Sequence, residues 1–316
     1  MDRQPRSGED FLSRRRVLAA VGGLAGVGAL AGYLGADSDS VAVLSAGSLA
    51  ATFEEYVGPA FERETGTAVH GEYYGTNAVM RMIEDGTKGP DAVVSADATL
   101  LRDRLYDGYT DWDVEFATNS VGIGYDPRTE LGRRLEAGEP WYELVRESED
   151  GAVAISDPDL DPLGYRAVQA FELAGREHGI EGLREELLAS VYMEPEEPQL
   201  LAGVETGSRA AAVVYRNMAV DHGLAFHEFP PAYNFADPSM ADRYATVEYT
   251  TDDGYTAEGR PVVYNATVLD SARNPEAGRR LVRFLADNGA LLGEAGLTVG
   301  GSLPRAVGDP PAVIDP

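Results

Sequence analysis

The sequence predicts an α/β protein of two lobes with a ligand cleft between them. Short runs rich in β-branched residues alternate with segments of helical periodicity, which is typical of a parallel sheet covered by helices. With 316 residues, 44% of them hydrophobic, the chain is long enough for two lobes with separate cores. We expect it to leave the first lobe near Glu115 and to return at residues 227–233, which gives two hinge crossings. Lobe 1 is therefore expected over residues 40–116 and 230–316, and lobe 2 over residues 117–229.

The first lobe begins with a β-α-β-α-β succession. The first predicted helix, residues 50–65, carries Phe53, Val57 and Phe61 at helical spacing. The second begins after residue 75, and Thr76 or Asn77 is expected to cap it. The strands are expected at residues 41–44, 69–74 and 91–95.

Further elements follow along the chain. A late helix should begin at Asn274-Pro275, because a capping side chain followed by proline is typical of a first helical turn. Before it we expect a strand at 120–125, a strand, turn and helix at 153–156, 157–161 and 165–177, a helix from about Leu200 and a strand at 211–215.

Two turns predict an anion site. Residues 45–49 and 75–77 each follow a predicted strand and precede a predicted helix. Each turn should therefore direct free backbone N–H groups and a hydroxyl toward the space above it. Two such turns side by side favour a bound anion. Gly47, Ser48 and Thr76 are the candidate residues.

The net charge of the chain limits the classes of partner that it can bind. The formal net charge is −27, from 53 acidic and 26 basic residues, and Lys88 is the only lysine. This acidic excess, spread along the chain, is typical of a halophilic protein that stays soluble in very high salt. Without a basic stripe it excludes nucleic acid as a partner. It does not exclude an oxyanion, because molar salt shortens the Debye length to roughly 3 Å and leaves local N–H dipoles to decide.

Several chemistries are excluded by the composition. The chain has no cysteine, so disulfides, thiolate metal sites, iron–sulfur clusters and cysteine nucleophiles are impossible. Its four histidines show no metal-ligand spacing, and there is no G-x-S-x-G nucleophile turn. We therefore expect no cofactor and no catalytic residue, with an exported hydrolase as the enzyme alternative.

The N-terminal segment, residues 1–36, is not expected to belong to the fold. Residues 13–18, Ser-Arg-Arg-Arg-Val-Leu, precede an apolar run and resemble a twin-arginine export signal. The run of about eighteen residues lies between the length of a signal core and that of a membrane span. Cleavage near Ala36 and retention as a membrane anchor both stay open, and either places the protein at the extracellular face of the cell membrane.

A series of spaced motifs resembles the extracellular molybdate/tungstate-binding proteins of ABC transporters, in their archaeal form. The resemblance implies a type II periplasmic-binding-protein fold that captures an oxyanion between two lobes. It also implies a monomer that delivers the ion to an ABC transporter permease. The motifs lie at residues 46–49, 75–77, 90–97, 161–166, 213–216 and 259–264.

The resemblance also assigns ligand-binding residues. Ser48, with the neighbouring Gly47 amide, matches the first hydroxyl donor, and Thr76 stands where the family usually has serine. Leu163 matches a backbone amide donor and Tyr215 a hydroxyl donor. Hydroxyls and amides suit a fully ionised oxyanion, which offers only acceptors.

Two carboxylates distinguish the archaeal branch of this family, because they approach the metal of the oxyanion itself. Asp161 and Glu197 match these metal-binding positions, and Asp157 competes with Asp161. A carboxylate that faces a dianion is repelled unless it bonds to the metal, which sulfate does not permit. Such a pair would exclude sulfate.

Other ligands and simpler roles remain open. Sulfate, phosphate or ferric ion could bind the same fold, with Tyr73, Tyr74 and Tyr215 as iron ligands. The hydroxyl residues could be ordinary helix caps, and the carboxylates a turn residue and a solvated acid. Asn265 begins an N-glycosylation pattern, but its place in a predicted strand, residues 262–269, favours a buried and unmodified asparagine.

Overall fold

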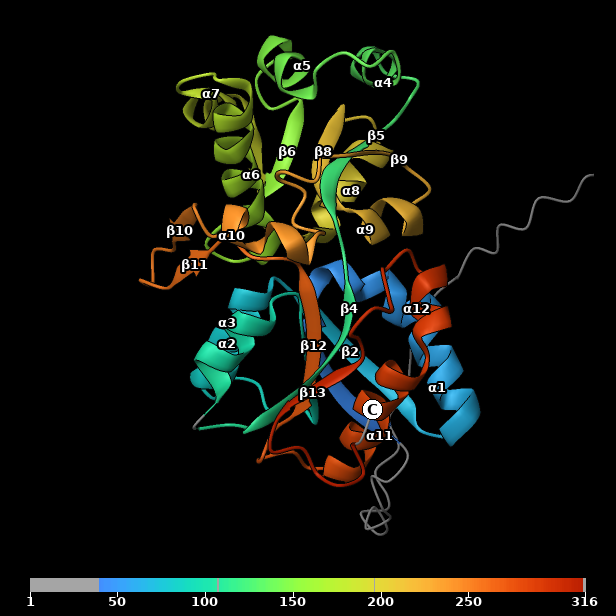
Figure 1. Cartoon of the computed structure of the whole chain (residues 1–316). Coiled ribbons are helices and arrows are strands. Elements are labelled where there is room, and N and C mark those ends of the chain that lie inside the picture. The colour runs from blue at the N-terminus through green and yellow to red at the C-terminus, as the bar shows by residue number, and fades with distance from the viewer. Residues whose placement is uncertain (1–39, 107, 196, 315–316) are drawn as a thin grey trace, which may run out of the picture. The chain divides into compact units, whose positions relative to one another are not determined.

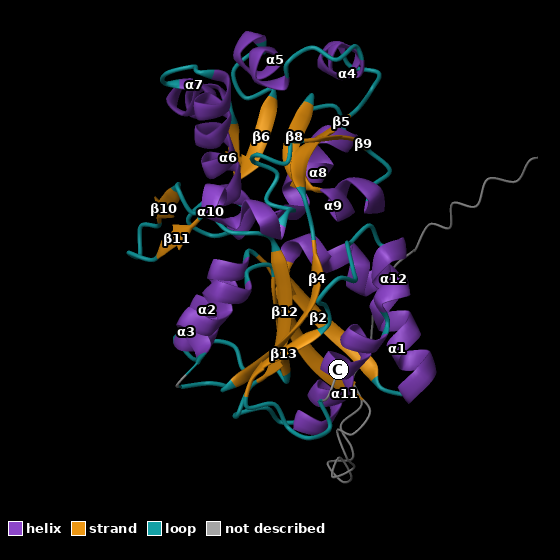
Figure 2. Ribbon diagram, in the orientation of Figure 1, coloured by secondary structure: helices purple, strands orange, loops and turns teal. Residues whose placement is uncertain are grey.

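Two larger β-sheets covered by helices make up the architecture of this computed structural model, which describes residues 40–106, 108–195 and 197–314 (Figures 1 and 2). The expected export segment, residues 1–36, lies outside the described residues. In the described ranges, no helix is both long and apolar enough to cross a membrane.

The six-stranded sheet consists of β1 (Ser40–Ala46), β2 (Ala68–Tyr74), β3 (Ala92–Ser95), β4 (Trp112–Thr118), β12 (Val263–Val268) and β13 (Arg305–Gly308). Its spatial order is β13-β4-β12-β3-β1-β2. β1 is parallel to β2 and β3, so the predicted β-α-β-α-β start is confirmed. β12 is antiparallel to both β3 and β4, and β13 is antiparallel to β4, which makes the complete sheet mixed.

The five-stranded sheet consists of β5 (Val121–Tyr125), β6 (Val153–Ser156), β7 (Tyr192–Glu194), β8 (Ala211–Tyr215) and β9 (Ala225–Glu228). Its order is β7-β6-β8-β5-β9. The chain enters this sheet between Thr118 and Val121 and leaves it after Glu228. A hairpin of β10 (Glu248–Thr250) and β11 (Thr256–Glu258) follows before the chain returns to β12. Hinge motion at these two passages stays a prediction.

The helices cover the faces of the sheets. In Figure 1, α2 and α3 lie on one side of the six-stranded sheet and α1, α11 and α12 on the other. The helical elements are η1 (Gly47–Leu49), η2 (Thr52–Val57), α1 (Gly58–Thr65), α2 (Thr76–Glu84), α3 (Ala98–Leu105), α4 (Glu130–Glu136), α5 (Trp141–Glu147), α6 (Pro162–His178), α7 (Leu183–Ser190), α8 (Glu197–Glu205), α9 (Arg216–Asp221), η3 (Pro238–Met240), α10 (Ala241–Tyr244), α11 (Pro275–Asp287) and α12 (Gly289–Glu294).

Apolar residues of the strands alternate between the two faces of the six-stranded sheet. Val43 of β1 joins the cluster that contains Phe61 and Phe284, whereas the next residue, Leu44, joins the cluster that contains Met80. This alternation follows from the two-residue repeat of a strand. Both faces of the sheet are thus packed against helices, and its strand ends are left to form a site.

Two local predictions differ in part from the structure. Gly75, not Thr76 or Asn77, occupies the N-cap of α2, and it offers no side-chain hydrogen bond. Residues 50–65 are helical as predicted, but they contain a π-helical segment, η2, before α1, and Pro59, which has no N–H to donate, lies at the start of α1. By contrast, Asn274 caps α11 as predicted, and its side chain accepts from the Ala277 amide.

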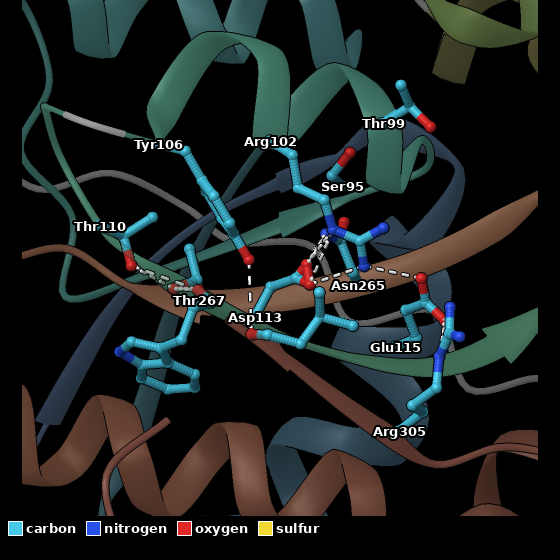
Figure 3. Close-up of polar contacts among 12 residues, drawn as sticks. Ser95, Thr99, Arg102, Tyr106, Thr110, Asp113, Glu115, Asn265, Thr267 and Arg305 are labelled. Carbon is cyan, nitrogen blue, oxygen red and sulfur yellow. Dashed lines mark hydrogen bonds and ion pairs between the residues drawn. The ribbon is translucent and has the colours of Figure 1, made fainter. Parts of the chain in front are cut away.

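Strand β4 was not predicted, because its acidic residues suggest a surface segment. Figure 3 shows how the structure accommodates them. Arg102 of α3 donates to Asp113 at 2.8 Å and to Glu115 at 2.6 Å. Arg305 of β13 pairs with Glu115 at 2.7 Å. Burial raises the pKa of Asp113, and its bonds to Arg102 oppose that rise.

The glycosylation pattern at Asn265 lies in the same network. Asn265 is fully buried in β12, and its side-chain amide donates to Asp113 at 2.8 Å (Figure 3). The folded protein therefore does not present this asparagine to a glycosyltransferase, in keeping with the buried position expected from its strand context.

Candidate functional site

The Ser48 turn meets helix α8 at a direct hydrogen bond. Gly47 and Ser48 follow the end of β1, and Glu197 is the first residue of α8. The Ser48 backbone N–H donates to Oε2 of Glu197 at 2.6 Å, although the residues are 149 positions apart. A Cβ on Gly47 would lie 2.6 Å from the same oxygen, so a larger residue there would displace the Glu197 carboxylate. The turn predicted to bind an anion thus faces a carboxylate.

Asp161 stands at the N-cap of α6 and is almost fully buried. Its Oδ1 accepts from the Leu163 amide at 3.0 Å, and its Oδ2 accepts from the Ser156 hydroxyl at 2.6 Å. The Leu163 amide, expected to serve the ligand, is therefore occupied by Asp161 in this structure. Asp157 is only half-buried and accepts from the Asp159 amide in the preceding turn, so it has the position of a turn residue.

The two predicted metal-binding carboxylates interact with each other. Burial raises the pKa of Glu197 well above its usual range, and the charge of Asp161 raises it further. Burial also raises the pKa of Asp161, against the effect of its bond from Ser156. Among the described residues, Oε1 of Glu197 has no hydrogen-bond partner. A buried acid pair without a full set of partners is costly for the fold, and such groups are typical of functional sites.

Tyr215 ends β8 and is completely buried. Its hydroxyl oxygen accepts from Nη1 of Arg166 at 2.7 Å. Burial raises the pKa of Tyr215 well above its usual value, so the hydroxyl keeps its proton at neutral pH. The charges of Asp161 and Glu197 act on the same hydroxyl, which places it within the electrostatic reach of both acids.

Two residues of the site were missed by the sequence analysis. The Tyr264 hydroxyl donates to the Ser48 hydroxyl at 3.3 Å, and the Asn217 side chain donates to the Ser48 carbonyl at 2.7 Å. Asn119 joins these two residues by donating to both. Tyr264 ends the motif at 259–264 and Asn217 directly follows the motif at 213–216, so proximity to the motifs was the available signal.

The second predicted turn packs against the chain that leads into Asp161. A Cβ on Gly75 would lie 2.3 Å from the Leu160 carbonyl oxygen and 3.0 Å from the Asp161 Cβ. The Asn77 side chain donates to the Asp159 carbonyl at 2.8 Å. The Thr76 hydroxyl accepts at 3.2 Å from the amide of Ala96, which directly follows β3. The turn is thus close to Asp161, while the Thr76 hydroxyl has a local partner.

Cavities do not by themselves locate the site. A cavity of about 30 Å³ lies beside Glu197 and is lined by Gly47, Ser48, Met218, Asp221 and His222, among others. A larger cavity of about 530 Å³ is lined by residues such as Arg102, Glu115 and Arg260 and touches none of the predicted ligand-binding residues. The convergence of buried polar groups therefore marks the site, and the size of a cavity does not.

Known proteins resemble most of this chain. The family described as bacterial extracellular solute-binding protein matches residues 41–297. An uncharacterized solute-binding protein of Halobacterium salinarum is 49% identical, with 96% of this chain and 98% of that protein covered. A Haloferax volcanii protein, provisionally named an ABC transporter molybdenum-binding protein, is 38% identical, with 97% and 98% covered. The molybdate/tungstate-binding protein WtpA of Thermococcus kodakarensis is 32% identical, with 81% and 79% covered.

Solved structures share the fold at low sequence identity. The periplasmic molybdate-binding protein of Azotobacter vinelandii matches with a TM-score of 0.62 at 16% identity. The match covers 83% of this chain and 100% of the Azotobacter chain. Iron-bound HitA of Pseudomonas aeruginosa matches with a TM-score of 0.51 at 16% identity, with 86% and 89% covered. Because proteins with different ligands share this architecture, the fold alone does not identify the ligand.

Proposed function

The chain belongs to the bacterial extracellular solute-binding proteins, and on this premise we propose that it captures tungstate or molybdate for an ABC importer. Its fold is that of the type II periplasmic binding proteins, as the structural matches show. The names of the Haloferax and Thermococcus relatives support these two oxyanions as the ligands. The extracellular character of the family supports export, and the twin-arginine-like segment provides a route for it.

One observation carries the choice of ligand: hydrogen-bond donors and two buried carboxylates meet at the same place. The Ser48 amide lies 2.6 Å from a Glu197 oxygen, and Asp161 acts electrostatically on Glu197. A fully ionised oxyanion needs donors on its oxygens. A carboxylate beside such an anion is tolerated only where it bonds to a metal centre, which tungstate and molybdate possess. Sulfate and phosphate offer no such centre and would be repelled.

Some hydrogen-bond donors of the site would be free to bind the oxyanion at once, and others would have to reorient first. The Ser48 hydroxyl and the Tyr215 hydroxyl would donate to the oxyanion. The Ser48 amide would become available when Glu197 turns from it toward the metal. The Thr76 hydroxyl accepts from the Ala96 amide, so its own proton stays free to donate. The Leu163 amide now donates to Asp161, so it would join only after a local change. A ligand that contacts residues of both sheets would stabilise the closed form, because it makes more contacts there than in an open form. A membrane permease would then recognise the closed form.

Ferric ion is less well supported. Tyr73 and Tyr74 are neighbours on β2, so their side chains leave opposite faces of the strand. Burial raises the pKa of Tyr215, against the lowering effect of the Arg166 guanidinium, which disfavours the phenolate that iron requires. Coloured bound material would indicate iron.

We also assign no catalytic step to Ser48. His222 lines the same small cavity, but its Nδ1 pairs with Glu205 at 2.6 Å. A serine nucleophile needs a base that is oriented toward it. Turnover of phosphate or carboxylate esters by the purified protein would contradict this assignment.

Calorimetric titration in molar salt tests the proposed function. Tungstate and molybdate should bind and raise the melting temperature. At a ligand concentration of a hundred times Kd, the expected gain in the free energy of unfolding is about 2.7 kcal/mol. Sulfate and phosphate should neither bind nor stabilise the protein. Glu197→Gln should lower the preference for tungstate over sulfate, whereas Glu181→Gln, at an exposed position after α6, should not change it. Equal stabilisation by sulfate or phosphate would overturn the metal–carboxylate proposal.

A further inference from the structure

We propose that Arg166 is a positioning residue that fixes the direction of the Tyr215 hydroxyl proton, so that Tyr215 can act only as a donor toward the ligand. The inference rests on the proposed function, because it concerns the same oxyanion site. It adds a role for a residue that does not itself touch the ligand.

The contacts of Arg166 determine what Tyr215 can do. Arg166 lies in the first turns of α6 and is 1% exposed. Its Nη1 donates to the Tyr215 hydroxyl oxygen at 2.7 Å and to the Ala96 carbonyl at 3.2 Å. A guanidinium has five donors, no acceptor and no accessible neutral form. The Tyr215 oxygen must therefore accept from Arg166, and its own proton must point elsewhere.

The Tyr215 proton is available for a ligand. Burial raises the pKa of Tyr215 well above its usual value, so the proton is retained. Within the part of the chain that the structure describes, this hydroxyl donates to no other group. Asp161 and Glu197 act on it electrostatically. The hydroxyl thus keeps a free proton within electrostatic reach of the two carboxylates, where the proposed oxyanion would bind.

Asp97 holds Arg166 from the other sheet. Asp97 follows β3 and caps α3, where its Oδ1 accepts from the amides of Thr99 and Leu100. Its Oδ2 accepts from Arg166 Nη2 at 2.7 Å and from the Tyr165 hydroxyl at 2.6 Å. Tyr215 ends a strand of the five-stranded sheet and Asp97 follows a strand of the six-stranded one, so the guanidinium is fully held only when the two sheets are together as in this structure.

The cost of this arrangement argues against a purely structural role. Taking a guanidinium and a carboxylate out of water is expensive, and a buried ion pair is weak evidence for stability. Arg166 also leaves its Nε without a hydrogen-bond partner within the described ranges. The ion pair with Asp97 instead fixes one orientation of the planar Arg166 guanidinium, and so of its N–H donors, against the Tyr215 hydroxyl. A donor that is oriented before binding loses less entropy when the ligand arrives.

A double-mutant cycle on tungstate affinity tests the inference. Tyr215→Phe should weaken binding by about 10–100-fold, the loss of one hydrogen bond to a charged acceptor. Arg166→Met should weaken binding by a similar factor in the native background, but by less than about threefold in the Y215F background, because its effect acts through the hydroxyl. Arg166→Lys, which keeps a donor, should recover part of the loss. An equal loss from R166M in both backgrounds would overturn the inference.

Two further measurements separate this inference from folding defects and from the proposed function. Asp97→Asn keeps an N-cap but removes the charge that holds Arg166, so it should weaken binding less than R166M does and only where Tyr215 is present. The NMR chemical shift of the Tyr215 ring carbon that bears the hydroxyl should change in R166M without any ligand. An unchanged shift would contradict the inference, whereas failure of the native protein to bind tungstate and molybdate would contradict the proposed function alone.

Discussion

The backbone amide of Ser48 donates to the carboxylate of Glu197 at 2.6 Å, and this bond joins the end of β1 to the start of α8. The amide that a bound oxyanion would need is thus occupied by an oxygen of Glu197. The stability of the free protein and the affinity for its ligand should therefore depend on Glu197 in opposite directions.

Glu197→Gln should make the free protein more stable while it weakens tungstate binding. Burial raises the pKa of Glu197, so the native fold loses stability as pH rises from the unfolded value toward the folded one. Glutamine does not titrate and escapes this loss. We expect a gain of about 1 kcal/mol at pH 8, or about 2–4 °C in melting temperature, and a smaller difference near pH 4. Melting curves across this range would check it, and a destabilised variant at pH 8 would contradict it.

Gly75→Ala should weaken ligand binding by preventing the close contact of the two sheets. The added Cβ would lie 2.3 Å from the Leu160 carbonyl oxygen, which is backbone and cannot rotate away. We expect at least a tenfold loss of affinity and a larger radius of gyration in small-angle X-ray scattering. Gly89→Ala is the matched control, because no atom lies within 4 Å of its added Cβ. Native affinity in the Gly75 variant would refute the prediction.

Asn265→Asp should strongly destabilise the fold. The new carboxylate would stand against Asp113 in a fully buried position, where the native amide now donates at 2.8 Å. Arg102 already donates hydrogen bonds to Asp113 and Glu115, so a third carboxylate would add a buried charge that no cation neutralises. The expected cost is about 3–5 kcal/mol, measured by chemical unfolding.

The same burial predicts that Asn265 carries no glycan. Mass spectrometry of the peptide that contains Asn265, from protein purified in its folded form, should give the unmodified mass. A glycosylated fraction would show that modification precedes folding.

Asp221→Asn should stabilise the protein above about pH 6. Burial raises the pKa of Asp221 to about 6, against the bond from the Thr52 hydroxyl. Because the folded pKa is above the unfolded one, native stability falls as pH rises between about 4 and 6 and stays lower above it. Asparagine can still accept from Thr52, so the variant should gain at pH 8 and not at pH 4. Asp221 is partly exposed, so screening limits the gain to about 1 kcal/mol or less.

Local patterns of the sequence predicted much of the fold. β6 and β8 match their predicted bounds, since their apolar runs are buried on both faces. Asn274-Pro275 marked the start of α11 because capping depends on adjacent residues only. β4 escaped prediction because Asp113 and Glu115 are neutralised by Arg102, an ion-pair partner that no local pattern reveals.

The candidate site was predictable residue by residue but not as an arrangement. The family resemblance singled out Ser48, Asp161, Glu197 and Tyr215, which the structure brings within electrostatic reach of one another. It did not reveal that the Leu163 amide and the Thr76 hydroxyl bond to Asp161 and to the Ala96 amide. Hydrogen-bond partners depend on orientation, which spacing along the chain does not carry.

The sequence by itself determined the α/β class, the parallel start of the first sheet, the two glycine turns and the acidic surface charge. These follow from periodicity, turn chemistry and composition, all of which act over a few residues or over the whole chain. Only the tertiary structure decided that Asp161 and Glu197 form a buried pair, that Ser48 donates to Glu197, and that Arg166 directs Tyr215 while Asp97 holds it. The three hydrogen bonds join residues 49 or more positions apart. Those between Ser48 and Glu197 and between Arg166 and Asp97 exist because the two sheets pack together and bury polar groups between them.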